Sequence, residues 1–410
     1  MASREFFEIP KRYKTWSAGL IGVGALSVII AYIAYGRGEH PQLFWGALLQ
    51  NSAFFLLVVN ASMFFICATT LAMGGWQMSF RRVPEAISTA VVPIGIITAV
   101  VCLLIVLLPT HFYHWQHPDG DKILEFKKGF LNTPFYITFT LLTIVLWIVL
   151  GRKMRALSQE LDNNPLPNAE AGRKYIFKNT VWASVFIAWF GLTTMSTLPW
   201  FWLMSIDAHW YSTMYSWYTF ASTFVSGMAL IALFVIYMKN KGYLEYTNNE
   251  HLHDIGKFMF AFSIFWTYLW FSQYMLIWYA NIPEETVYFK SRISAQGHDS
   301  GPYSGIFWLS FVINFLAPLL LLMRRGAKRN YASMVFMAVV IIFGHWLDFY
   351  QMIFASIDPT HVNKGMFVLS LGIAAGFIGI IMNSVGNAMS KTPLVAKNHP
   401  FTKESIIHHT

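Results

Sequence analysis

Two ionisable residues lie three positions apart inside a long apolar stretch. The segment Phe343–Gln351 contains His345 and Asp348, and residues with this spacing share one face of an α-helix. A neutral imidazole beside a carboxylate can take up and pass on protons near neutral pH, as a proton relay or a quinol deprotonation site requires. The alternative is a buried pair that only satisfies its own hydrogen bonds. We favour the functional interpretation, because ionisable residues inside a bilayer are costly and are functional by default.

The composition indicates that the helix carrying this pair crosses a membrane. Of 410 residues, 56% are hydrophobic and 12% are charged, against roughly a quarter charged in soluble domains. Ten apolar stretches are long enough to span about 30 Å of hydrocarbon. They lie near residues 15–36, 43–73, 84–109, 132–151, 178–205, 213–238, 257–280, 303–323, 331–356 and 365–388. We therefore expect an all-α integral membrane protein with a ten-helix domain over residues 15–388, preceded by segment 1–14 and followed by tail 389–410.

The basic residues predict the orientation, because Lys and Arg accumulate on the cytoplasmic side of membrane proteins. Placing both termini on one side puts 22 of the 29 basic residues there and 7 on the other. Two clusters dominate this count: Arg152, Lys153 and Arg155 after the fourth stretch, and Arg324, Arg325, Lys328 and Arg329 after the eighth. We expect cytoplasmic termini in a multi-pass protein of a bacterial inner membrane.

The cysteine and histidine content argues against a redox centre in this chain. The two cysteines, Cys67 and Cys102, lie in apolar stretches and cannot build a disulfide framework or an iron–sulfur ligand set. The 13 histidines form no compact boxes, and only His345 is deep enough to ligate a membrane haem. We expect no catalytic residue and no bound metal. The formal charge of +9 is spread over short loops, which does not indicate nucleic-acid binding.

Further titratable residues gather on the side opposite the termini. Candidate proton-relay or quinone-facing groups are Asp207, His209, Glu284 and Glu285. His111, His114, His117, Asp358 and His361 lie on the same side, where ordinary headgroup-level residues also occur. Uncharged candidates for a polar path through the membrane are Asn60, Gln273, Asn314, Ser222 and Thr223. Each of these also has a simpler explanation as a hydrogen-bonding group between neighbouring helices. Such a bond contributes only about 0.6 kcal/mol to stability on average.

An internal echo predicts the helix arrangement. The segment Ser205–His209 closes the fifth stretch, and the similar segment Ser356–His361 closes the ninth. An offset of four helices preserves orientation, so we expect two parallel four-helix bundles plus two peripheral helices. Coincidence in a short polar loop is the alternative. In the tenth stretch, Gly372 and Gly376 form a small-xxx-small pair that predicts a close helix contact.

The segment Phe271–Glu285, which reads FSQYMLIWYANIPEE, resembles the signature of the NrfD/PsrC-like membrane subunits of bacterial alternative complex III. Length and the Ser205–His209 segment make the chain most similar to the ActF type rather than to its longer paralogue ActC. The resemblance implies a quinol:electron acceptor oxidoreductase complex, in which electrons pass to an iron–sulfur subunit and then to c-type haems. It implies that these cofactors sit in partner subunits and that quinone or quinol is the candidate ligand of this chain.

The implied partners are an ActC-like paralogue, an iron–sulfur subunit, multihaem and monohaem cytochrome c subunits and other membrane anchors, with a terminal oxidase as a further candidate and lipids around them. The quinol site of the family is generally attributed to the ActC-like paralogue. What carries over to this chain is His345 and Asp348 as candidate groups and Asn281–Glu285 as the motif region.

Three roles within such a complex remain open: a second quinone site, a proton channel without redox chemistry of its own, and a structural membrane anchor. A stand-alone proton-coupled transporter ranks last. Transporters usually place broken helices and substrate ligands near the bilayer midplane, whereas the helix order puts His345 and Asp348 outward of it.

Overall fold

The computed structural model describes residues 5–38, 40–293, 301–396 and 398–409. Residues 1–4 of the expected segment 1–14, and residues 397 and 410 of the expected tail 389–410, lie outside the described residues. The structure is 80% helical, and no strand occurs in its described part. The prediction of an all-α protein is confirmed.

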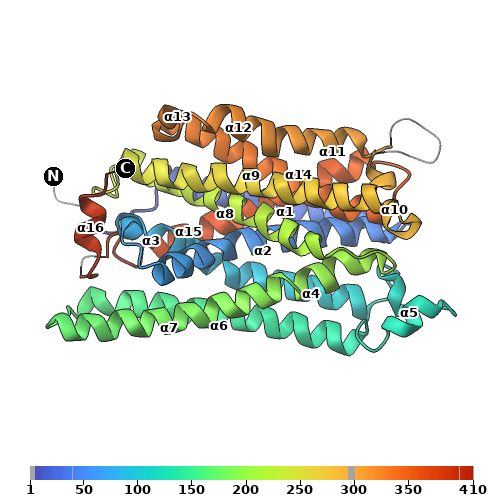
Figure 1. Cartoon of the computed structure of the whole chain (residues 1–410), viewed down its shortest axis with the longest axis horizontal. Coiled ribbons are helices and arrows are strands. Elements are labelled where there is room, and N and C mark those ends of the chain that lie inside the picture. Colours follow the sequence, from blue (N-terminus) through green and yellow to red (C-terminus); the bar gives the residue numbers. More distant parts are fainter. Residues whose placement is uncertain (1–4, 39, 294–300, 397, 410) are drawn as a thin grey trace.

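The long helices run side by side along the longest axis of the molecule (Figure 1). Eight are continuous: α1 (Lys11–Ala31), α2 (Pro41–Leu71), α6 (Thr133–Asn163), α7 (Ala169–Thr194), α8 (Thr213–Asn240), α9 (Asn249–Ala280), α14 (Tyr331–Ile357) and α15 (Lys364–Met389). Two are built from pieces: α3 (Arg82–Ile87), η3 (Ser88–Ala90) and α4 (Val91–Leu107), and α11 (Ser304–Phe311), the π-helical turn η7 (Val312–Leu316) and α12 (Ala317–Leu322).

Short helices connect or extend these elements. They are η1 (Tyr32–Gly36), η2 (Trp76–Ser79), η4 (His114–Gln116), α5 (Lys122–Lys127), η5 (Thr197–Leu203), η6 (Met204–Asp207), α10 (Pro283–Ile293), α13 (Arg325–Arg329) and α16 (Thr402–Ile406). The described ends of the chain lie at the same end of the helices, beside α16, whereas α5 and α10 lie at the opposite end (Figure 1). We call these the terminal end and the far end.

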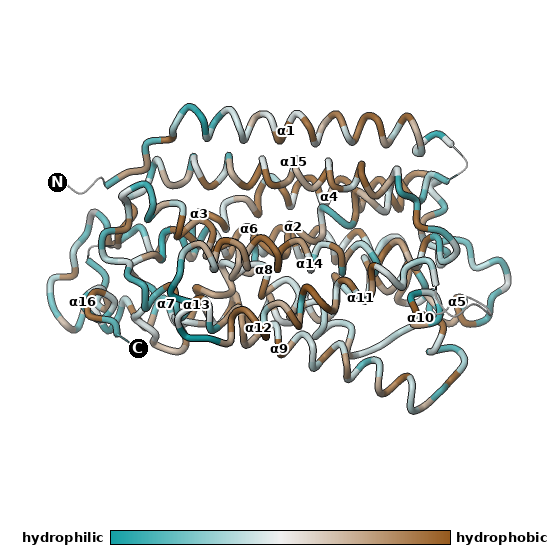
Figure 2. Tube along the Cα trace, turned by 90° about the horizontal axis from the view of Figure 1, so that it is seen from above, coloured by the Kyte–Doolittle hydropathy of each residue, from teal (hydrophilic) through white to brown (hydrophobic). Residues whose placement is uncertain are grey.

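Within the described residues, nine helices are long and apolar enough to cross a membrane. They correspond to nine of the ten expected spans. The remaining span, expected at 257–280, lies in α9, which has 32 residues but begins with the polar residues His251, His253 and Asp254 and is rich in Trp and Tyr. Polar residues gather at both ends of the molecule and hydrophobic ones between them (Figure 2). The chain is thus a multi-pass membrane protein by its helices, with nine rather than ten spans by this criterion.

The long helices contact one another in a regular order. Helix α2 packs on α4 and α7, and α6 packs on the same two helices. Helix α8 packs on α9 and α14, and α12 packs on these two as well. Helix α2 also contacts α8 and α14, which places these three helices at the centre. Helices α1 and α15 pair with each other at one edge of the molecule (Figure 2).

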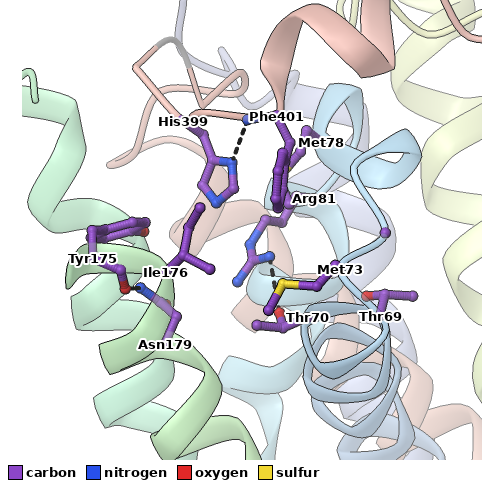
Figure 3. A pocket seen from close by; sticks show the side chains of 11 residues that line it. Thr69, Thr70, Met73, Met78, Arg81, Tyr175, Ile176, Asn179, His399 and Phe401 are labelled. Atoms are coloured by element: carbon purple, nitrogen blue, oxygen red, sulfur yellow. Dashed lines mark hydrogen bonds between the residues drawn. The ribbon is translucent and has the colours of Figure 1, made fainter. Parts of the chain in front are cut away.

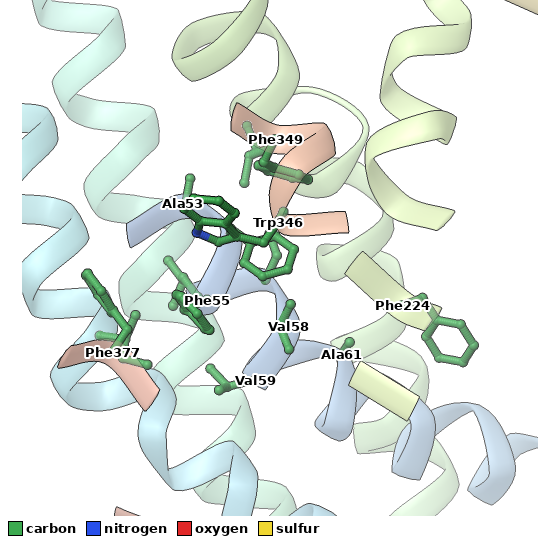
Figure 4. Packing of buried hydrophobic residues seen from close by; sticks show 14 of the residues in the cluster. Ala53, Phe55, Val58, Val59, Ala61, Phe224, Trp346, Phe349 and Phe377 are labelled. Carbon is green, nitrogen blue, oxygen red and sulfur yellow. The ribbon is translucent and has the colours of Figure 1, made fainter. Parts of the chain in front are cut away.

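Close packing rather than hydrophobicity alone must hold these helices together, because lipid chains are as apolar as leucine. In the core, Phe55 of α2 stacks on Phe377 of α15 with ring centroids 5.6 Å apart (Figure 4). At the edge, a Cβ added to Gly376 would lie 2.8 Å from the Cα of Gly24 on α1, and one added to Gly372 would collide with Ser27. The predicted close contact at Gly372 and Gly376 is therefore confirmed, and α1 is the partner helix.

Candidate proton-transfer site

Helix α14 (Tyr331–Ile357) carries the two ionisable residues of the predicted pair just beyond its midpoint, in the half nearer the far end. His345 and Asp348 are both fully buried, with an exposed fraction of 0%. Their side chains bond to residues of α8 and α9, so this face of α14 points into the helix group formed by α8, α9, α12 and α14. The expectation that both residues share one helix face agrees with these contacts.

Asp348 accepts hydrogen bonds from three neutral side chains. The phenolic hydroxyl of Tyr218 on α8 donates to Oδ1. The indole Nε1 of Trp266 on α9 donates to Oδ2 at 3.3 Å, and Nε2 of Gln351 donates to Oδ1 at 3.0 Å. A buried carboxylate needs such donors, because leaving it without partners would cost several kcal/mol. These three donors satisfy an ionised carboxylate without a direct salt bridge.

His345 occupies the neighbouring position and has spare hydrogen-bonding capacity. Its Nδ1 lies 3.0 Å from Oγ of Ser222 on α8. Its Nε2 has no hydrogen-bond partner among the described residues. The ring of Trp266 packs edge-on against the imidazole with centroids 5.3 Å apart. Trp266 thus touches both ionisable residues, while His345 and Asp348 bond to different residues of α8.

The candidate path residues are all buried, but their bonding differs. Within the described part of the chain, Nδ2 of Asn60, Nε2 of Gln273 and both amide atoms of Asn314 lack a hydrogen-bond partner. Thr223, by contrast, donates to the carbonyl of Thr219 on its own helix at 2.9 Å. Ser222 is the path candidate that bonds directly to the site.

Asn314 is the candidate with the most unusual surroundings. It lies in the π-helical turn η7, a type of distortion often found at functional sites. A Cβ added to Gly344 would collide with its Oδ1, so the amide packs directly against the backbone next to His345. Gly344 is what allows this approach.

The four candidates at the far end do not join the buried site. Asp207 ends η6, and His209 follows it with its Nε2 2.6 Å from Oδ2 of Asp121 at the surface. This hydrogen bond from His209 lowers the pKa of Asp121 below its usual range. Glu284 and Glu285 lie in the first turn of α10, where acidic side chains favour the helix dipole. Their positions indicate local structural roles.

A second polar cluster, which the sequence analysis did not single out, is buried at the terminal end. Glu85 of α3 accepts from Nε of Arg81 at 3.0 Å and from Nη1 of Arg82 at 2.7 Å. Arg82 also pairs with Asp162 of α6 at 2.5 Å. The signal in the sequence is the pair of adjacent arginines with a glutamate one helical turn later; for the orientation, the two arginines count only as positive charges.

A small cavity of about 20 Å³ adjoins this cluster, with room for about one water molecule. Figure 3 shows Arg81 of the cluster and His399 of the carboxy-terminal tail at its wall, with Tyr175 and Asn179 of α7 opposite. Burial lowers the pKa of His399 to about 3, and the charge of Arg81 adds to this effect. His399 is therefore neutral at physiological pH, and its Nδ1 accepts from the backbone N–H of Phe401.

No family model matches the chain, and no curated protein matches it either. Across the described ranges, no group of three or more His, Cys, Asp or Glu side chains is placed to hold a metal ion. Chemically, the arrangement around Asp348 is suited to holding and exchanging a proton, because a carboxyl group and an imidazole with a free nitrogen lie beside neutral donors.

Sequence reasoning missed part of this site. Gln351 stands three residues after Asp348, and the same helical spacing that paired Asp348 with His345 could have identified it. Tyr218 gave no signal, because tyrosines are frequent in this chain and its contact with Asp348 arises only from the packing of α8 on α14.

Proposed function

We propose that this chain is a membrane subunit of a quinol-oxidising respiratory complex of the alternative complex III type, in a bacterial inner membrane. In this role it provides a proton-conducting path and a candidate quinone-facing surface, while an iron–sulfur subunit and c-type cytochromes carry the electrons. The ActC-like paralogue and further membrane anchors complete the assembly.

The observation that carries the proposal is the fully buried Asp348 held by Tyr218, Trp266 and Gln351. Burying an ionisable group in a membrane helix is expensive, and such groups are retained where protons or ions move. Nε2 of His345, which has no hydrogen-bond partner among the described residues, supplies a second atom that can exchange a proton.

The helix contacts support the proposed architecture of two four-helix bundles with two peripheral helices. The cyclic contacts of α2, α4, α6 and α7, and of α8, α9, α12 and α14, are what such a duplication requires, and α1 and α15 are the remaining pair. From the distribution of Lys and Arg, we assign the terminal end to the cytoplasm and the far end to the periplasm.

The first test is the composition of the native assembly. The chain, carrying an affinity tag and purified from its own membranes in mild detergent, should bring with it haem-stained cytochrome c subunits and quinol-oxidising activity. Purification as a stable monomer without haem-bearing partners would exclude a complex of this type.

The second test addresses the site. Asp348→Asn should reduce quinol turnover or its coupling to proton movement, because the amide cannot release a proton. The matched control is Asp358→Asn after the end of α14, where the side-chain oxygen accepts from the backbone N–H of Thr360 and His361 and an amide oxygen can do the same. If both variants were as active as the natural chain, Asp348 would contribute only to packing. The chain would then be a structural anchor of the complex.

A further inference from the structure

A buried positive charge lies near the proton-transfer site but outside it. Arg292 of α10 has an exposed fraction of 1%. In the described part of the chain its hydrogen bonds go to neutral groups: the carbonyls of Tyr288, Gln351 and Met352 and the hydroxyls of Ser291 and Ser356. The guanidinium also covers the ring of Tyr288 at 3.6 Å from the centroid. Burying an arginine on neutral partners is costly, so its presence at this position calls for an explanation.

The position of Arg292 along α14 is defined by these bonds. Nη2 reaches the carbonyls of Gln351 at 3.3 Å and Met352 at 3.2 Å, which follow Asp348 by about one turn in the direction of the far end. Gln351 itself bonds to Asp348 through its side chain. The charge of Arg292 also acts electrostatically on Asp348. Arg292 therefore lies between Asp348 and the far end, and Gln351 connects the two by bonding to both.

The groups on the opposite side of Asp348 are different in kind. Toward the terminal end, α14 presents the neutral imidazole of His345, and α8 presents Ser222 followed by Ser226, whose hydroxyl bonds to the carbonyl of Ser222. Ser263 of α9 is fully buried, and its hydroxyl has no partner among the described residues. This side offers uncharged groups that can both donate and accept hydrogen bonds, as a proton path needs.

Besides Arg292, the described titratable groups that act on Asp348 or lie one turn from it are neutral side chains. They are Tyr215 and Tyr218 of α8, Tyr288 of α10 and the imidazole of His345 on α14. Arg292, in contrast, brings a guanidinium group, which is a cation, next to this set of neutral side chains.

We propose that Arg292 is an electrostatic barrier that closes the far side of the Asp348 site to protons and other cations, so that Asp348 exchanges protons with water only at the terminal end. A fixed guanidinium in a narrow, poorly hydrated region repels an incoming cation, which is how positive charges exclude protons in membrane pores. The inference refines the proposed function by giving the site a sidedness, and it rests on that function only for the role of Asp348 as a proton-binding group.

A purely structural role of Arg292 is distinguishable by substitution. In a purely structural role, which we call a staple, Arg292 would stabilise the last turns of α14. It would do so by hydrogen bonds to the carbonyls and by its interaction with the helix dipole. Arg292→Lys keeps the charge but loses most of these bonds, whereas Arg292→Gln keeps hydrogen-bonding capacity but loses the charge. A barrier depends on the charge, and a staple depends on the bonds.

The test measures passive proton flux without quinol. The tagged chain, with the subunits that accompany it from native membranes, is reconstituted into liposomes containing a pH-sensitive dye, and a potassium gradient with valinomycin drives protons inward. We expect Arg292→Gln to raise the proton flux at least several-fold, Arg292→Lys to stay as tight as the natural chain, and Arg292→Gln combined with Asp348→Asn to be tight again. A folded Arg292→Gln variant without a leak, or a leak that persists in the double variant, would overturn the proposal.

A second measurement uses the natural chain and therefore does not depend on the folding of any Arg292 variant. In membrane vesicles of known orientation, the infrared carboxyl band of Asp348 is assigned by its absence in Asp348→Asn. An acid jump at the terminal end should change this band, and an acid jump at the far end should not. A response to the far end first would contradict the barrier. Neither measurement needs quinol oxidation. The barrier can therefore be confirmed or refuted separately from the proposal that the native assembly contains cytochromes.

Discussion

The phenolic hydroxyl of Tyr218 on α8 donates a hydrogen bond to the carboxylate of Asp348 on α14, across 130 positions of the sequence. The bond links the packing of these two central helices to the ionisable group in the half of α14 nearer the far end. Because this hydrogen bond joins α8 to α14, a change in the charge of Asp348 changes the strength of the contact between the two helices.

Removing this hydroxyl should destabilise the protein. Interhelical hydrogen bonds in membranes average about 0.6 kcal/mol, whereas bonds to charged groups in proteins reach about 1.5 to 3 kcal/mol. Since Asp348 keeps two other donors, we expect Tyr218→Phe to lower the free energy of unfolding by about 1 to 2 kcal/mol. Unfolding in mixed detergent micelles, followed by tryptophan fluorescence, measures the change.

Tyr350→Phe is the matched control for that experiment. Tyr350 lies on the same helix and is fully buried, but its hydroxyl has no hydrogen-bond partner among the described residues. Its removal should leave the stability nearly unchanged. An equal loss in both variants would mean that the Tyr218 bond contributes nothing specific.

The ionic cluster at the terminal end predicts a larger effect. Glu85 bonds to both Arg81 and Arg82 in a buried environment, so Glu85→Gln leaves one guanidinium without a carboxylate. We expect a loss of about 3 kcal/mol, because removing one partner of a buried ion pair costs roughly 3 to 5 kcal/mol and Arg82 keeps Asp162. Glu170→Gln, which breaks an exposed pair with Lys174, should change the stability by less than about 0.5 kcal/mol. Similar melting temperatures for the two variants would refute the distinction.

The contact between α1 and α15 should be sensitive to side-chain volume. Gly376 has no room for a Cβ against Gly24, while Gly22 on α1 faces open space. Gly376→Leu should separate the two helices and cost about 1 to 3 kcal/mol, whereas Gly22→Leu should not. A cysteine cross-link between α1 and α15 that forms equally well in both variants would show that the close approach is dispensable.

His399 predicts a pH dependence of stability. Its pKa is lowered to about 3 in the folded chain by burial and by Arg81, while an unfolded histidine titrates near 6.5. The unfolded state therefore binds more protons between these values, so the contribution of His399 is fully present above about pH 6.5 and is lost as the pH falls toward 3.

The comparison that isolates this effect is His399→Gln. The variant should lose less stability than the natural chain on acidification from pH 7 to pH 4, as measured by melting temperature at several pH values. Parallel curves for the two proteins would show that His399 is accessible to protons in the folded state.

The sequence alone determined the features that depend on local order. Apolar stretches located nine helices that fit a membrane and the position of α9, and helical spacing placed His345 and Asp348 on one face. The ends of helices were less well predicted. The fourth apolar stretch ends at residue 151, where charges begin, yet α6 continues to Asn163. Contacts with α3 and α7, such as Arg82 with Asp162 and Tyr175 with the carbonyl of Leu157, stabilise the turns beyond the apolar stretch.

Tertiary structure alone decided which polar groups meet. Tyr218, Trp266 and Arg292 lie far from Asp348 in sequence, and nothing in their local surroundings marks them as its neighbours. Hydropathy reports that a helix is apolar, but it does not say which side faces lipid and which faces another helix, because both surroundings favour the same residues. Only the packing of α8, α9 and α10 around α14 separates a buried carboxylate with partners from one without them.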